Sequence, residues 1–108
     1  MYHLTKRDAE FISTCMALAI SVLARKGSRH SSEEYQRVLT MFSTGRAMNE
    51  SDWYMIYTVL AEQEKRARLA LIKGRGAKRD MLLQEIIFYS SLCQQKIEIL
   101  LKEANGEL

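Results

Sequence analysis

The sequence contains no proline and few of the residues that interrupt helices or coordinate metals. Its 108 residues include only five glycines, two cysteines and two histidines. Proline lacks an N–H donor and collides with the preceding turn of a helix, so its absence favours long uninterrupted helices. The scarcity of glycine has the same implication. No alternation of apolar and polar residues is stronger than the helical period, and we therefore expect no β-strand.

The cysteines and histidines do not have the spacing of a metal site. Cys15 and Cys93 each lack a nearby second cysteine, and neither His3 nor His30 has a ligand partner at metal-binding spacing. The segment GRGAKR at 74–79 lacks the Gly-Lys-Ser/Thr ending of a phosphate-binding loop. We therefore expect no catalytic residue, no metal and no cofactor, and a protein that is not an enzyme.

The sequence also lacks a run of apolar residues long enough to cross a bilayer. Its longest, residues 11–24, is shorter than the roughly 20 residues that a membrane-spanning helix needs. The run ends in a signal-peptidase-like Val-Leu-Ala, but Asp8 and Glu10 stand where a signal peptide carries positive charge. Both cysteines lie in apolar helical patterns, which is typical of buried, reduced thiols. These features predict a soluble cytoplasmic protein that does not contact membranes.

Helical periodicity divides the chain into four segments. The predicted helices cover residues Lys6–Arg25, 32–42, 51–73 and 78–104. Thr5 and Asp8 form a capping box before the first, residues 31–34 form another before the second, and residues 49–52 offer caps for the third. The length fits a single helical domain, residues 1–108. The sequence therefore predicts an all-α fold, a small four-helix bundle in up-down-up-down order with a short second helix.

The first predicted helix is the most apolar. Within residues 11–24 the only polar residues are Ser13, Thr14 and Ser21, and all three fall on one narrow side. A helix that is apolar nearly all round is buried rather than placed at the surface. We therefore expect this helix to be central in the bundle, with Leu18 in the core.

Positive charge is concentrated near the end of the third predicted helix. Residues 65–79 hold seven lysines and arginines and no acid, whereas the whole chain has a net charge of +3, so the remainder carries −4. Two of the seven follow an acid by four residues, in the pairs Glu62–Arg66 and Glu64–Arg68, which is a favourable order on a helix. Such segregation creates a local field that the net charge conceals.

Up-down-up-down topology predicts that the first and third connections meet at one end of the bundle. The resulting basic pole is a candidate partner-binding site that consists of Arg25, Lys26, Arg29, Lys73, Arg75, Lys78 and Arg79. A simpler explanation remains open, because helix dipoles favour cations in the last turn of any helix. That explanation does not cover Lys78 and Arg79, which begin the fourth helix, where the dipole favours acids.

The third and fourth predicted helices carry more apolar side chains than one core face requires. The surplus residues are the candidates for an apolar partner-binding or dimer surface: Met55, Val59, Met81, Phe88 and Leu92. Such a surplus is typical of a self-association face or of a groove for a partner helix. The alternative is that four unequal helices bury both sides within the monomer. We expect a homodimer.

These features favour a non-enzymatic interaction or regulatory protein, of the adaptor or inhibitor type, that occupies the surface of a partner protein. The alternative is a nucleic-acid-associated protein that binds phosphates through residues 25–30 and 65–79. Recognition of single-stranded nucleic acid relies on aromatic stacking, and residues 58–87 contain no aromatic side chain. Any nucleic-acid contact would therefore be directed mainly at phosphates.

Overall fold

The computed structural model of the protein describes residues 4–74 and 76–104, without the side chains of Arg29 and Ala104. It contains four helices, α1 (Lys6–Arg25), α2 (Arg29–Ser43), α3 (Glu50–Lys73) and α4 (Ala77–Ala104). The described residues form no strand. The predicted all-α class is confirmed, and α2 is the shortest helix, as expected. The bounds of α1 agree with the prediction, and those of α3 and α4 differ from it by one residue at most.

Two helices begin with capping boxes, α1 at the box that the sequence predicts and α3 within residues 49–52, where it offers caps. The Thr5 hydroxyl accepts from the Asp8 amide at 3.1 Å, and the Asp8 carboxylate accepts from the Thr5 amide at 2.9 Å. Asn49 and Asp52 form the same reciprocal pair at the start of α3. Each box satisfies N–H groups that a helix start leaves without partners.

The capping box predicted at residues 31–34 is wrong, because α2 starts earlier, at Arg29, without a side-chain cap. Gly27 has a φ of 77° and turns the chain at the end of α1, as its conformational freedom allows. The Ser28 amide then donates to the Leu23 carbonyl at 2.9 Å. Because the chain reverses within three residues, the next helix begins before the predicted cap is reached.

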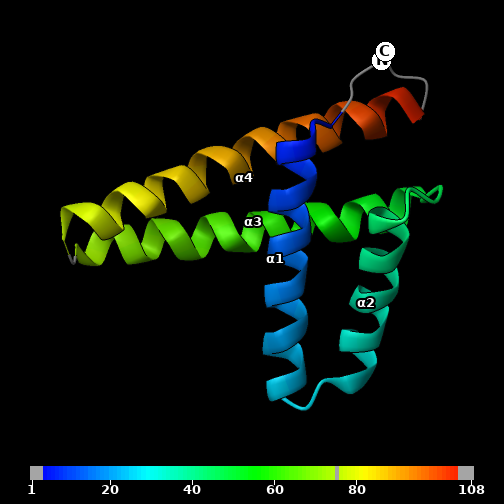
Figure 1. Ribbon diagram of the computed structural model, residues 1–108, viewed down its shortest axis with the longest axis horizontal. Coiled ribbons are helices and arrows are strands. Elements are labelled where there is room, and N and C mark those ends of the chain that lie inside the picture. The colour runs from blue at the N-terminus through cyan, green and yellow to red at the C-terminus, as the bar shows by residue number, and fades with distance from the viewer. Residues whose placement is uncertain (1–3, 75, 105–108) are drawn as a thin grey trace.

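The four helices form two hairpins that cross each other (Figure 1). Within each pair, α1–α2 and α3–α4, the helices pack side by side in antiparallel order, and α1 also contacts both α3 and α4. The molecule measures 44 × 35 × 22 Å, and its smallest dimension is that of two stacked helices. Since the hairpins cross, the α1–α2 turn and the α3–α4 turn lie apart, which departs from the expectation that they meet at one end.

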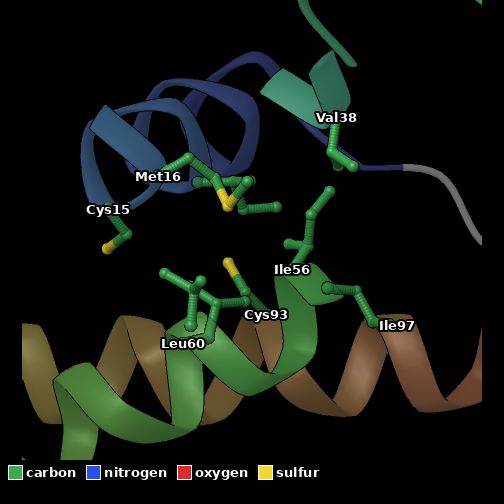
Figure 2. Packing of buried hydrophobic residues seen from close by; sticks show 9 residues of the cluster. Cys15, Met16, Val38, Ile56, Leu60, Cys93 and Ile97 are labelled. Carbon is green, nitrogen blue, oxygen red and sulfur yellow. The ribbon is translucent and has the colours of Figure 1, made fainter. Parts of the chain in front are cut away.

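The core lies at the crossing, and all four helices contribute to it. Figure 2 shows Met16 of α1, Val38 of α2, Ile56 of α3 and Ile97 of α4 pointing toward one another. Cys15 and Cys93 are free thiols in the same cluster, as expected. Burial raises the pKa of Cys15 to about 11 and that of Cys93 to about 12, so both are unreactive near neutral pH.

The expectation that Leu18 lies in the core is wrong, since its side chain is 52% exposed. The buried apolar residues of α1 are Ile12, Cys15 and Met16, all in the half of the helix that crosses α3 and α4. Beyond the crossing α1 has only α2 beside it. Its apolar circumference is therefore wider than the surface that the other helices cover.

Two ion pairs fasten the helices at the crossing. Asp8 of α1 accepts from the Lys96 ammonium of α4, and both residues are buried. Arg37 of α2 donates to the buried Asp52 of α3 at 3.1 Å. Buried charges are costly unless they are paired, so these contacts fix the angle and register at which the helices meet.

Candidate protein-binding surface

The distal parts of α3 and α4 project beyond α1 as a two-helix arm (Figure 1). We use the word arm for residues 65–73 and 77–88. Ala67 is buried between the two helices, and Leu71, Leu83, Ile86 and Ile87 are half-buried. The remaining large apolar side chains of the arm are exposed: Leu69, Ile72, Met81, Leu82 and Phe88. The arm therefore combines the basic segment with an unusual amount of apolar surface.

A first cleft lies in the corner where α1 and α2 leave α3. This corner cleft has a volume of about 260 Å³. Its apolar wall includes Val22 and Leu23 of α1 and Val59 of α3, and its charged residues are Lys26, Glu62 and Arg66. Apolar walls bordered by a few charged groups are typical of sites that accept an apolar side chain and orient its polar neighbours.

A second cleft continues from the first along the arm. This arm groove, of about 300 Å³, is lined by Arg66, Leu69, Ala70, Lys73 and Arg79. Arg66 lines both clefts. Leu69 and Ala70 are each three or four residues from Arg66 and from Lys73, so the four α3 residues share one side of the helix. The two clefts therefore form one continuous surface along that side of α3.

The electrostatics of this surface are dominated by cations. The Arg66 guanidinium donates to Glu62 at 3.3 Å, and both side chains are about half exposed, so solvent weakens the pair. For Lys26, Lys73 and Arg79 the described part of the chain shows no ion pair. Three positive charges beside an apolar floor create a local positive potential on this surface.

The predicted basic pole is only partly assembled. Lys26 lines the corner cleft, and Lys73 and Arg79 line the arm groove. Arg25 instead turns back to the Ser21 carbonyl of its own helix, at 3.4 Å. Lys78 is exposed in the first turn of α4 but lines neither cleft. Arg75 and the side chain of Arg29 lie outside the described residues.

The predicted apolar candidates fall into two groups. Val59 is buried in the core, although it also lines the corner cleft, and Met55 packs against the core. The expectation that the two side chains form an exposed dimer face is therefore wrong. Both lie on the part of α3 that α1 and α2 cover. Met81 and Phe88 are exposed on the arm, and Leu92 is half-buried beside it. These three remain available for a partner.

The acid in the apolar pattern of α3 is paired, as expected. Glu64 accepts from the Arg68 guanidinium at 3.2 Å and from the Gln94 amide of α4 at 3.1 Å. Two turns toward the core, Tyr57 donates to Glu98 of α4 at 2.8 Å, and this bond raises the pKa of Tyr57. These polar contacts stabilise the α3–α4 pair. Among the residues that the structure describes, no three His, Cys, Asp or Glu side chains are placed to hold a metal ion.

Arg66 is the residue of this surface that the predicted pole omits. The sequence contains a signal for it, since Arg66 and Lys73 are seven residues apart and so lie on the same side of a helix. Glu62 and Val59 belong to this surface because α1 crosses α3 beside them. The spacing of residues within α3 does not specify that crossing. Leu82 is exposed, because α1 does not extend over the arm.

No family model, no curated protein and no solved structure matches this chain. None of the described helices combines the length and the apolar content that crossing a membrane requires. Any function must therefore be inferred from the residues and their placement.

Proposed function

We propose that the protein is a non-enzymatic interaction protein that binds the acidic surface of another protein through the corner cleft and the arm groove. The observation that carries this proposal is the shared Arg66, which joins two clefts with apolar floors and cationic borders. An apolar side chain of the partner enters the corner cleft beside Val22 and Leu23. Carboxylates next to it reach Lys26, Lys73 and Arg79. Such a protein acts as an adaptor or inhibitor in the cytoplasm by occupying its partner's surface.

The apolar floor favours a protein over a nucleic acid as the partner. A surface that binds phosphates needs lysines and arginines but gains little from aliphatic side chains between them. Here Leu69 lies among the cations of the arm groove, more than half exposed. Burial of this apolar surface contributes to binding in proportion to its area, and the cations provide steering and specificity. Nucleic-acid binding through the same cations is the second candidate function.

The proposal includes a homodimer. Apolar side chains on α4, among them Met81 and Phe88, stay exposed on the arm although the clefts do not use them. A second copy would cover them. The acidic partner and the second copy thus bind different sides of the arm.

Charge reversal within the two clefts tests the binding site. The groove variant is Lys26→Glu, Lys73→Glu and Arg79→Glu, and the control variant is Lys6→Glu, Arg46→Glu and Lys102→Glu. The two sets are matched, since each reverses one charge near a loop, one in a first helical turn and one in a last turn. Each surface substitution changes folding stability by less than about 0.5 kcal/mol.

The native protein and both variants serve as baits in an extract of the native host treated with nuclease. We expect the native protein and the control to capture the same acidic protein, and the groove variant to lose at least tenfold of it. Equal capture by the groove variant would contradict the proposal. The nucleic-acid alternative predicts instead that nuclease abolishes capture. It also predicts that affinity for duplex DNA falls linearly with salt on logarithmic axes.

A further inference from the structure

One row of α4 side chains is left uncovered by the other helices. The row, which we name the α4 stripe, consists of Met81, Gln84, Phe88, Leu92, Gln95 and Ile99. Successive members are three or four residues apart, so they lie one above another along the helix. None of the six is buried, and four are exposed. Gln84, Phe88, Leu92 and Gln95 also line one shallow groove of about 330 Å³ between α3 and α4.

The order of residues in the stripe is the same in both directions. From either end it runs apolar, amide, apolar, apolar, amide, apolar. Its centre lies at residue 90, midway between Phe88 and Leu92 and also between Met81 and Ile99. The two glutamines lie at almost the same distance from that centre. In a two-fold symmetric contact residue i of one copy contacts residue j of the other and the reverse. This order therefore places apolar side chains against apolar ones and amides against amides.

We propose that two copies of this chain pack through the α4 stripe, with their α4 helices antiparallel across a two-fold axis near residue 90. Phe88 of each copy then meets Leu92 of the other, and Met81 meets Ile99. Gln84 lies opposite Gln95, so that the two amides donate and accept hydrogen bonds across the interface. This inference rests on the proposed homodimer and specifies its surface, direction and register.

The charge of the stripe favours a second copy over an acidic or basic partner. No member of the stripe is charged. The groove between α3 and α4 contains one charged residue, Arg68, and the cleft beside Met81 and Phe88 contains one acid, Glu85. Glu64 accepts from Arg68 at 3.2 Å and offsets its charge. A second copy therefore meets no repulsion from like charges on this side of the arm. On the arm groove, by contrast, Lys73 and Arg79 would oppose the same residues of a symmetric partner.

The stripe is large enough for a dimer. From Met81 to Ile99 it extends about 27 Å, at a rise of about 1.5 Å per residue. With α3 beside it, the face is about 20 Å wide, twice the diameter of a helix. Two such faces bury roughly 1,000 Å², which is the lower bound for a specific interface. The Phe88 ring is held edge-on against Tyr89 with centroids 5.2 Å apart, so an anchor for the partner is already oriented.

Engineered cysteines distinguish the antiparallel register from other arrangements. In the proposed dimer, positions 84 and 95 of different copies are opposite each other, whereas two copies of position 84 are about 18 Å apart along the axis. A disulfide requires Cα atoms within about 7 Å. We therefore expect a mixture of the Gln84→Cys and Gln95→Cys proteins to form a covalent heterodimer on oxidation. Each protein by itself should form none.

The native chain is the control for the cross-linking, since Cys15 and Cys93 are buried and burial raises their pKa values. A covalent homodimer of the Gln84→Cys protein would overturn the antiparallel register. Absence of the heterodimer from the mixture would overturn it too.

Light scattering separates failure of this surface from failure of the homodimer itself. We expect light scattering to give the mass of a dimer for the native protein and of a monomer for the Phe88→Glu, Leu92→Glu variant. Circular dichroism should show that the variant is folded. The Ile72→Glu, Leu82→Glu variant places two charges on exposed apolar sites of the arm outside the stripe and outside both clefts, and it should stay dimeric. A dimer that survives Phe88→Glu, Leu92→Glu would remove the stripe but retain the homodimer. A native protein that is monomeric at every concentration would remove both.

Discussion

At the crossing, α3 and α4 are covered by a second pair of helices, whereas in the arm the same two helices have only each other. Leu60 and Leu69 illustrate the difference, because they are identical side chains on one helix. Leu60 is fully buried at the crossing, and Leu69 is more than half exposed in the arm. Charged residues differ in the same way, since Lys96 is buried against Asp8 while Lys73 is exposed. The position of α1, rather than the residue type, therefore decides which part of the hairpin serves stability.

The arm divides further into two sides of different chemistry. The side continuous with the corner cleft carries the cations Arg66, Lys73 and Arg79. The α4 stripe carries no charge. Like charges repel across a symmetric contact, so the first side suits an acidic partner and the second suits another copy of the chain. A dimer formed through the stripe would leave the cationic side of each copy free to bind an acidic partner.

The largest contrast between the two regions is expected for buried charge. Replacement Lys96→Met leaves the Asp8 carboxylate buried without its cation, and loss of one partner of a buried pair costs about 3–5 kcal/mol. Lys73→Met in the arm removes an exposed charge and should change the free energy of unfolding by less than about 0.5 kcal/mol. Urea unfolding at pH 7 measures both. Similar losses for the two variants would show that the Asp8–Lys96 pair does not anchor the crossing.

A smaller contrast is expected for the two leucines. Leu60→Ala creates a cavity in the core and should lower the free energy of unfolding by about 2–5 kcal/mol. Leu69→Ala should lower it by less than about 0.5 kcal/mol, because solvent already contacts the side chain. The same urea experiment measures this pair. A cost of 2 kcal/mol or more for Leu69→Ala would mean that the arm is covered in solution, as an interface with another chain would require.

The sequence predicts the elements of this fold better than their arrangement. The bounds of α1 follow from local chemistry, since the Thr5–Asp8 capping box begins the helix and Gly27 allows the turn after it. The burial of Leu18 does not follow, because it depends on the length of α1 that lies over the other hairpin. Periodicity identifies an apolar side chain, but it does not show whether a third helix covers it.

The candidate site was predictable to a similar degree. Charge by itself predicts three residues of the site, Lys26, Lys73 and Arg79, and the structure places all three along neighbouring clefts. The predicted reason was that two turns meet, but the turns lie apart, and the long Arg66 side chain connects the clefts instead. Helical spacing predicts a partner face at Met55 and Val59, and this prediction fails because spacing contains no information on the tertiary contacts by which α1 and α2 cover them.

The smallest expected effect is the acid dependence of the crossing, through Asp8. Burial by itself raises the pKa of Asp8, but hydrogen bonds from Lys96 and from Thr5 outweigh it and hold that pKa below its ordinary value of 3.8. A carboxyl whose pKa is lowered in the folded state stabilises the fold above its unfolded pKa, and loses this contribution as the pH falls through the folded pKa. Cys93, whose pKa is about 12, stays neutral throughout.

We therefore expect the native protein to be more stable than the Asp8→Asn variant at pH 6, with a difference in free energy of unfolding that shrinks below about pH 4, near the ordinary pKa of an aspartate. Urea unfolding of both proteins from pH 6 to pH 2.5 measures that difference, and the other acids cancel because both chains contain them. A difference that stays constant down to pH 2.5 would mean that the pKa of Asp8 is the same in the folded and unfolded protein, and the charge of the carboxylate would then make no net contribution to the stability of the crossing. A difference that disappears in acid would assign part of the stability of the crossing, and none of that of the arm, to one carboxylate.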